Sequence, residues 1–276
     1  LGNLCLGDTA NFTLAFGAGS FPITVDLDTN GASLVFTVNS DTTLSFPQNS
    51  AGTSTYQINS ITDANGCTET IFPAPIGIIV DDAPVAAILS GGDDICSGET
   101  DSLVVAITGG TAPYNAYIDV FGATPFAGLN STDSFEVAPG ATTTYTLDSV
   151  VDNLGCSFAP AGQTTTTTVN PLPAASIATS TPNICLGDPA DLDITFSAGT
   201  GPFDLRYTDG VNTYNETGLT GPTATVQVTP GFDSTYNFVI DSLFDTGTGC
   251  FSVAPSADLT GTATVNVNPN TSPSVS

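Results

Sequence analysis

The feature that most constrains the fold is a threefold internal repeat marked by cysteines. One set recurs about 90 residues apart, within the similar segments LCLGDTANFTLAF, ICSGETDSLVVAI and ICLGDPADLDITF, and consists of Cys5, Cys96 and Cys185. A second set closes STYQINSITDANGC, TTYTLDSVVDNLGC and STYNFVIDSLFDTGTGC, and consists of Cys67, Cys156 and Cys250. Because self-similarity at a fixed period is the signature of repeat architectures, we expect three tandem homologous domains. Their predicted limits are residues 1–82, 83–171 and 172–268, followed by residues 269–276 as a linker or the start of a next-repeat strand.

Each repeat has the pattern of a β-protein. Short runs such as SLVVAI and DLDITF are rich in β-branched residues and partly alternate, as half-buried strands do. Asn65-Gly66 is a strong hairpin signal. No long apolar period of 3.6 residues with helix caps is present. The sequence therefore predicts an all-β chain of three tandem immunoglobulin-like β-sandwich domains, each with about seven strands, arranged end to end.

The first repeat differs from the others at its beginning. Pro84 and Pro173 each lie 12 residues before a cysteine, and the apolar runs that follow them should form a first strand. Only LGNL precedes Cys5, so we expect the first repeat to lack that strand. The tail Asn270–Ser276 in turn begins such a strand. Two interpretations remain open: the tail of one copy completes the first domain of the next, or both features reflect a boundary within a longer protein.

The cysteines predict disulfides formed in an oxidising compartment. We expect one bridge within each repeat: Cys5–Cys67, Cys96–Cys156 and Cys185–Cys250. In a rival arrangement the bridges cross the domain junctions as Cys67–Cys96 and Cys156–Cys185, which leaves Cys5 and Cys250 to pair between chains.

Composition excludes several classes of function. The chain has 27 acidic residues against one basic residue and a formal net charge of −26, so neither nucleic acid nor an anionic membrane is an expected partner. No apolar run is long enough to span a membrane. Without His or Lys there is no Ser-His-Asp arrangement, imidazole metal ligand, Schiff base or P-loop. We therefore expect no enzyme, no catalytic residue and no bound cofactor.

These repeated motifs resemble the Ig-like or PKD-like repeats of Bacteroidota cell-surface proteins, which are exported by the type IX secretion system and include gliding adhesins. The resemblance covers all three repeats and implies non-catalytic β-sandwich modules that serve as a stalk, spacer or adhesive surface. It also implies O-glycosylation at a motif of Asp, Ser or Thr, and a small apolar residue or Thr. That motif matches at Thr9, Thr42, Ser102, Ser149, Ser234 and Ser242.

Two charged features have weaker interpretations. Asp81 and Asp82 in VDDAPV resemble acidic interdomain linkers that bind Ca²⁺, although two carboxylates make an incomplete shell and a solvated linker is the alternative. The single cation, Arg206, should pair with a nearby acid such as Asp204 or Asp209.

The combined features favour a structural module of an extracellular filament, stalk or surface adhesin, which polymerises head to tail by strand complementation. Thr-rich strands without Lys leave sheet edges that accept another strand. Its partners would be copies of itself, or neighbouring repeats of a longer chain, and glycans. The alternatives are a carbohydrate- or surface-binding adhesin array and accessory modules of a larger secreted enzyme.

Overall fold

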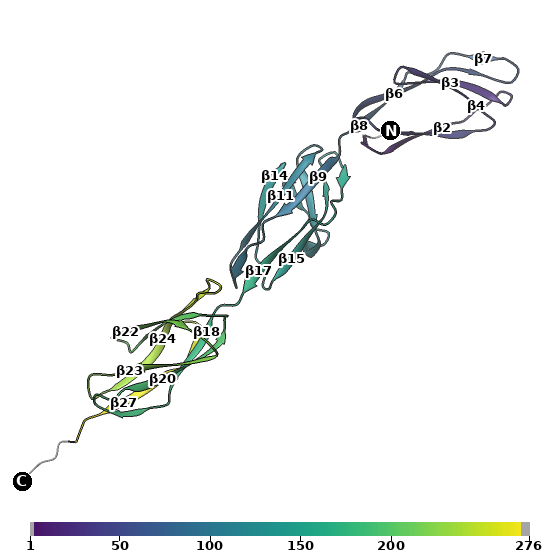
Figure 1. Ribbon diagram of the computed structural model, residues 1–276. Coiled ribbons are helices and arrows are strands. Elements are labelled where there is room, and N and C mark those ends of the chain that lie inside the picture. Colours follow the sequence, from purple (N-terminus) through teal and green to yellow (C-terminus); the bar gives the residue numbers. More distant parts are fainter. Residues whose placement is uncertain (1–2, 272–276) are drawn as a thin grey trace, which may run out of the picture. The chain divides into compact units, whose positions relative to one another are not determined.

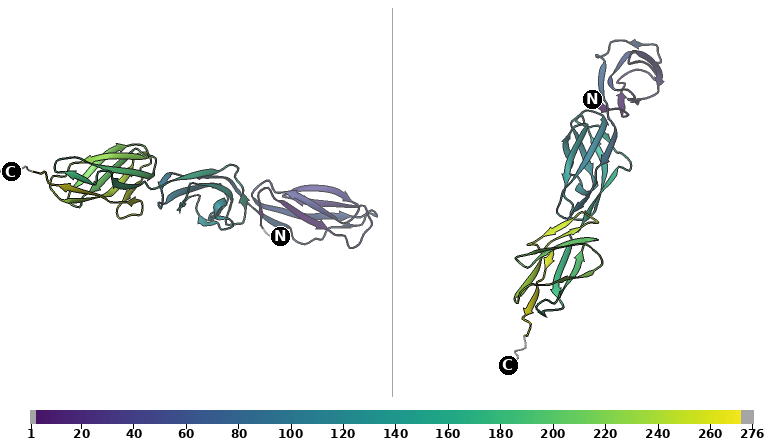
Figure 2. Two further views of the ribbon diagram at one scale, coloured as in Figure 1. Left: turned by 90° about the horizontal axis from the view of Figure 1, so that it is seen from below. Right: turned by 60° about the vertical axis from the view of Figure 1, so that its left-hand side comes forward.

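The computed structural model describes residues 3–271, and within them the regular structure is β apart from one 3₁₀ turn, η1 (Asp119–Phe121) (Figure 1). The strands form pairs of facing sheets, visible as two layers in Figure 2. The predicted fold class, tandem immunoglobulin-like β-sandwiches, is confirmed. The chain divides into two compact units, residues 1–90, 103–135 and 145–165 in one, and residues 91–102, 136–144 and 166–276 in the other. The repeat limits given above stay predictions.

The first sandwich is built from eight strands. The larger sheet has the order β1-β8-β6-β3-β4 with β7 beside β6, and the smaller sheet is the antiparallel pair β2-β5. The strands are β1 (Leu4–Cys5), β2 (Thr9–Leu14), β3 (Ile23–Thr29), β4 (Ala32–Val38), β5 (Thr42–Pro47), β6 (Gly52–Thr62), β7 (Thr68–Glu69) and β8 (Ile76–Asp81).

The second sandwich repeats this plan with one strand more in its smaller sheet. The larger sheet has the order β10-β17-β15-β12-β13 with β16 beside β15, and the smaller sheet is β14-β11-β9. The strands are β9 (Pro84–Ser90), β10 (Asp94–Cys96), β11 (Asp101–Gly109), β12 (Tyr114–Ile118), β13 (Phe126–Leu129), β14 (Thr132–Val137), β15 (Thr143–Val151), β16 (Ser157–Phe158) and β17 (Thr164–Asn170).

The third sandwich has one strand more in its smaller sheet than the second sandwich has. The larger sheet has the order β19-β27-β24-β21-β22 with β25 beside β24, and the smaller sheet is β23-β20-β18-β26. The strands are β18 (Ala174–Thr179), β19 (Asn183–Cys185), β20 (Ala190–Ala198), β21 (Phe203–Thr208), β22 (Thr213–Leu219), β23 (Thr223–Val228), β24 (Thr235–Asp245), β25 (Phe251–Val253), β26 (Leu259–Thr260) and β27 (Ala263–Asn268).

Alternating apolar residues account for the strands and their cores. In β12 the buried residues Tyr114, Ala116 and Ile118 alternate with half-buried ones, as a two-residue side-chain period requires. In β20, Leu192 and Ile194 are completely buried in one continuous core that both sheets of the third sandwich share. No helix among the described residues is long and apolar enough to cross a membrane.

The core of the first sandwich is less complete. It is split into two clusters, one around Tyr56 and Ile78 and the other around Val25. Phe12 and Leu14 on β2 are only half-buried, whereas Leu192 and Ile194, at the same places in the third repeat, are fully buried. The first sandwich therefore leaves apolar surface uncovered beside β2.

Candidate functional site: cysteine turns, cysteine hairpins and an open sheet edge

The disulfides differ from both arrangements predicted from the sequence. Cys5 is bonded to Cys156 with their Cα atoms 5.5 Å apart, and Cys96 is bonded to Cys250 with their Cα atoms 5.6 Å apart. The predicted intra-repeat pairs Cys5–Cys67, Cys96–Cys156 and Cys185–Cys250 are wrong, and so are the rival pairs Cys67–Cys96 and Cys156–Cys185. Of the six cysteines, all of them described, Cys67 and Cys185 are free and exposed. Each bridge joins the first cysteine of one repeat to the second cysteine of the next.

The length of one strand explains why intra-repeat bridges do not form. In the first sandwich Cys5 lies beside the end of β8, which pairs with the start of β6 at Gly52. Cys67 lies in the hairpin that follows the other end of β6, after Thr62. At 3.2–3.4 Å per residue, the 11 residues of β6 separate the two cysteines by about 35 Å. A disulfide needs Cα atoms roughly 4.4–6.8 Å apart.

The first cysteine of every repeat lies in the same tight turn. The cysteine ends a short strand that pairs in parallel with the last strand of its own sandwich, at Cys5↔Asp81, Cys96↔Asn170 and Cys185↔Asn268. The residue three positions after the cysteine closes the turn by donating its backbone amide to the cysteine carbonyl. The donors are Asp8 (2.9 Å), Glu99 (3.0 Å) and Asp188 (3.0 Å). The third position of the turn has φ between 92° and 96°, which explains the repeated glycine at Gly7, Gly98 and Gly187.

The second cysteine of every repeat closes a hairpin on an aspartate. In the first repeat the Asp63 amide donates to the Cys67 carbonyl (3.0 Å), and the Cys67 amide donates to Asp63 Oδ1 (2.9 Å). Asp152 and Cys156 make the same two hydrogen bonds, at 2.9 and 2.8 Å. In the third repeat the loop is one residue longer, and the Asp245 amide donates to the Cys250 carbonyl at 2.8 Å. The three hairpins therefore present their cysteines in closely similar ways.

The same aspartates fasten the hairpin to the Gly/Pro turn of their sandwich. The second carboxylate oxygen accepts a backbone amide from that turn, in the pairs Ser20–Asp63 (3.3 Å), Thr111–Asp152 (3.0 Å) and Thr200–Asp245 (2.7 Å). The pKa of Asp63 is lowered, chiefly by the Cys67 amide and also by the Ser20 and Asn65 amides, which stabilise the charged form. Burial opposes ionisation of Asp245, yet the Thr200 and Gly247 amides lower its pKa as well.

Burial separates the bonded hairpin cysteines from the free one. Cys156 and Cys250 are 1% and 0% exposed, whereas Cys67 is exposed. Cys185 is likewise exposed, while Cys5 and Cys96 in the equivalent turns are half-buried. Cys67 thus lies in a hairpin, and Cys185 in a turn, whose counterparts in other repeats hold disulfide-bonded cysteines.

The smaller sheet of the first sandwich has an open edge. Within the described residues β2 pairs only with β5, whereas the corresponding strands β11 and β20 also pair with β9 and β18. A cavity of about 360 Å³ opens beside β2. Its apolar lining comes from both sheets and from the segment before β8, and includes Phe12, Leu14, Leu44, Tyr56, Ile58 and Phe72.

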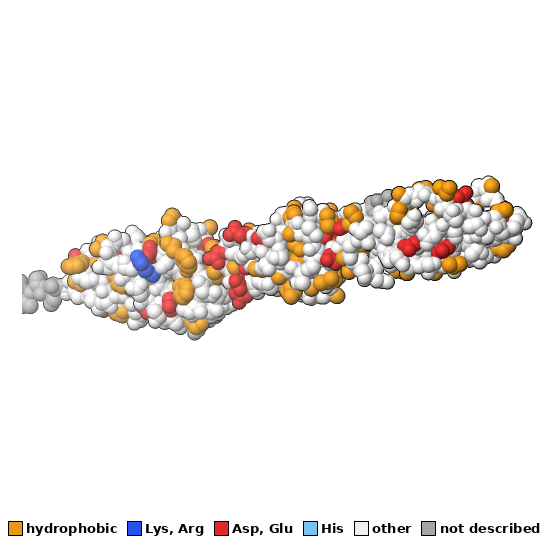
Figure 3. All heavy atoms as spheres, turned by 90° about the horizontal axis from the view of Figure 1, so that it is seen from above, with side chains coloured by type: hydrophobic (Ala, Val, Ile, Leu, Met, Phe, Trp, Pro, Cys, Tyr) orange, Lys and Arg blue, Asp and Glu red, His pale blue; other side chains and the backbone are white. Residues whose placement is uncertain are grey.

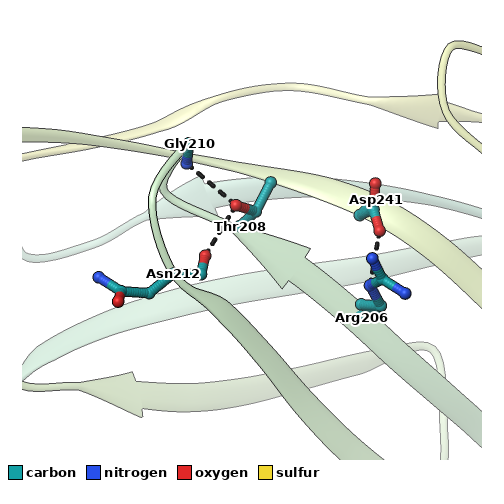
Figure 4. A network of polar contacts seen from close by, with 5 residues as sticks. All are labelled: Arg206, Thr208, Gly210, Asn212 and Asp241. Carbon is teal, nitrogen blue, oxygen red and sulfur yellow. Dashed lines mark hydrogen bonds and ion pairs between the residues drawn. The ribbon is translucent and has the colours of Figure 1, made fainter.

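The surface is sparsely charged. Figure 3 shows exposed hydrophobic side chains among scattered acidic ones on one face. The sequence contains a single basic residue. That residue, Arg206, pairs with Asp241 through Nε and Oδ2 at 2.6 Å (Figure 4), so the predicted pairing with Asp204 or Asp209 is wrong. Asp204 and Asp209 instead accept backbone amides, whereas Asp241 lies in a bulge of β24 beside the cross-strand partner of Arg206.

The other predicted site residues are spread over the molecule. Among the six glycosylation candidates, three are exposed, namely Thr9, Ser102 and Ser234, and three are half-buried, namely Thr42, Ser149 and Ser242. Asp81 accepts a hydrogen bond from Asn3 Nδ2 at 2.9 Å. Residues 3–271 contain no group of three or more acidic, Cys or His side chains arranged to hold a metal ion, so the structure adds no third ligand to Asp81 and Asp82.

The chain matches no protein-family profile and no curated protein. Among solved structures it is similar to a Ca²⁺-stabilised adhesin that helps an Antarctic bacterium reach out and bind ice, at 15% identity and a TM-score of 0.44 over 97% of this chain and 71% of that one. It is also similar to the three-domain ectodomain of mouse nectin-like molecule 4, at 15% identity and a TM-score of 0.39 over 99% of both chains. Because these TM-scores are below 0.5, the fold assignment rests on the sheets described above.

Proposed function

We propose that the chain is a non-catalytic structural module of an extracellular filament, stalk or surface adhesin of the Bacteroidota type described above, and that copies assemble head to tail by strand complementation. The observation that carries this proposal is the open edge of β2 beside an apolar cavity. The two disulfides support an oxidising, extracellular location.

The strand that would pair with β2 has a defined shape, because the other two sandwiches contain its counterpart. In the second sandwich β9 pairs with β11 in an antiparallel register that runs from Val104↔Ser90 to Thr108↔Ala86. In the third, Ala175 of β18 lies opposite Phe196 and is 1% exposed. A strand as long as β18 would satisfy backbone groups along that edge and cover the half-buried Phe12 and Leu14, whereas a shorter strand in this register would cover only the end of the edge nearest Phe16.

We infer that the added strand is Asn270–Ser276 of a second copy. Within it, residues 272–276 lie outside the described residues, so the assignment rests on sequence. Pro273 takes the place of Pro173 before the first strand of the third repeat, and Val275 then takes the place of the buried Ala175. Because Ala175 lies opposite Phe196, this register would put Val275 opposite Phe16, just beyond the end of β2. Because the donor surface and the acceptor surface differ, such contacts repeat from copy to copy and build a fibre.

Electron microscopy of three variants tests the assembly. Deleting Asn270–Ser276 should abolish filaments, and so should Val275→Asp, because a carboxylate would take the place of a buried apolar side chain beside Phe16. Ser274→Asp is the matched control, since in the proposed register its side chain would point away from the core, and this variant should leave filaments intact. Unchanged filaments after the deletion would show that strand complementation is not the mechanism.

A carbohydrate- or surface-binding role is the second candidate, favoured by exposed aromatic rings on the third sandwich. Phe244 and Phe251 are cross-strand partners on β24 and β25 and are 40% and 60% exposed. Aromatic faces stack on apolar ligand surfaces. Binding to a glycan array that is lost in Phe251→Ala and retained in Val253→Ala, an exposed neighbour on β25, would support this role.

A further inference from the structure

The two disulfides obey one rule, and that rule leaves two cysteines over. The first cysteine of one repeat bonds to the second cysteine of the following repeat, as Cys5–Cys156 and then Cys96–Cys250, with sequence separations of 151 and 154 residues. Continued forward, the rule asks for a hairpin cysteine in a repeat after the third. Continued backward, it asks for a turn cysteine in a repeat before the first. Cys185 and Cys67 are the free thiols that would bond to those two cysteines, respectively.

The turn that holds Cys185 is built like the turns whose cysteines are bonded. The residue after the cysteine donates its amide to the last strand of the sandwich, at 2.8 Å for Leu6 to Asp81 and 2.9 Å for Leu186 to Asn268. Both turns place glycine two residues after the cysteine with φ of 96°. Cys185 therefore needs no rearrangement of its backbone to act as Cys5 does.

The hairpin that holds Cys67 matches its bonded counterpart equally well. Asp63 receives the Cys67 amide at 2.9 Å, as Asp152 receives the Cys156 amide at 2.8 Å. The main difference is accessibility, because Cys67 is exposed and Cys156 is 1% exposed. A partner that bonds to Cys67 as Cys5 bonds to Cys156 would cover it in the same way.

We propose that Cys185 of one copy forms a disulfide with Cys67 of a second copy, so that successive copies are joined by the bridge that already joins successive repeats. This inference rests on the proposed head-to-tail assembly, which would hold the two thiols together at high effective concentration. The bond is useful to a chain of net charge −26, since copies with a like charge repel one another at the junction.

The bond forms by thiol–disulfide exchange with an oxidised dithiol or a small disulfide such as oxidised glutathione. The thiolate of one cysteine attacks the disulfide and expels one thiolate, and the second cysteine then displaces the other. Two thiols of the protein lose two protons and two electrons overall, and one disulfide of the oxidant is reduced to two thiols.

The test uses the full chain incubated with oxidised glutathione and separated on a non-reducing gel. The expected result is a ladder of covalent multimers that collapses to one band on reduction. Fragments obtained by cleavage at acidic residues should include Cys185 linked to Cys67. An absence of multimers, or equal amounts of Cys67–Cys67, Cys185–Cys185 and mixed bridges, would overturn the proposal.

Two single variants sharpen the test. Cys67→Ser and Cys185→Ser should each fail to form a ladder, whereas their mixture should yield a dimer through the remaining Cys185 and Cys67. Failure of the mixture to exceed the dimers of the separate variants would also overturn the proposal. The double variant separates the two proposals: it should still form filaments by strand complementation, without covalent links. Deleting Asn270–Ser276 tests strand complementation itself.

Discussion

Cys5 and Cys156 are bonded across 151 residues of sequence, so the first turn of one repeat is fixed to the hairpin of the next. Closing loops of this length constrains the unfolded chain by roughly 5 kcal/mol in loop-entropy terms. The bridges thus stabilise junctions between repeats.

The disulfide connectivity is the first prediction. Peptide mapping without reduction should find Cys5 linked to Cys156 and Cys96 linked to Cys250. Because each pair of cysteines within a repeat lies at opposite ends of a long strand, peptides linking Cys5 to Cys67 should be absent. Their recovery in quantity would contradict the fold of the first sandwich.

Acid should loosen the hairpin that presents Cys67. Amides of Cys67 and Ser20 lower the pKa of Asp63 below the ordinary value of 3.8, so its stabilising effect is present above that value and is lost as the pH falls through the folded-state pKa. The protection factor of the Cys67 amide, which compares its exchange with the intrinsic rate at the same pH, should therefore fall on acidification. Asp63→Asn should flatten this pH dependence, whereas Asp82→Asn, in an exposed linker position, should leave it unchanged.

Equal truncations should have unequal costs in the first and third sandwiches. Leu192→Ala removes a fully buried side chain and should cost about 2–5 kcal/mol. Leu14→Ala should cost less, because Leu14 is only half-buried beside the open edge of β2. Hydrogen exchange resolved to β20 and β2 measures the two losses separately. Equal losses would mean that the β2 edge is covered in solution.

The ion pair of Arg206 should matter little to stability. Its side chain is 54% exposed and that of Asp241 is 33% exposed, so solvent screens the pair. Arg206→Ala should change the free energy of unfolding of the third sandwich by less than about 1 kcal/mol. Denaturant unfolding of the full chain, followed by hydrogen exchange in β21 and β24, gives this value. A loss of stability well above that limit would show that packing of the Arg206 side chain contributes more than its ion pair with Asp241.

Local patterns were enough to predict the β fold and the repeats. Strands such as β20 alternate buried residues with half-buried or exposed ones in sequence, and the turns recur at fixed distances from the cysteines. The disulfide partners were not predictable from spacing, because equal spacing is compatible with any pairing that treats the repeats alike. One signal was present: β6 is long and ends shortly before Cys67, which puts that cysteine far from Cys5. The partner of Arg206 depends on a bulge in β24, which the sequence pattern does not reveal.

The two disulfides also limit how far the chain stretches under tension. Their loops overlap, so a pull between Cys5 and Cys250 travels through one bridge to Cys156, back along the backbone to Cys96, and out through the other bridge. That path contains about 60 residues and extends to roughly 200 Å at 3.3–3.6 Å per residue, about a quarter of the length available to the reduced chain. Even with all three sandwiches unfolded, the oxidised protein would not extend between Cys5 and Cys250 beyond that length.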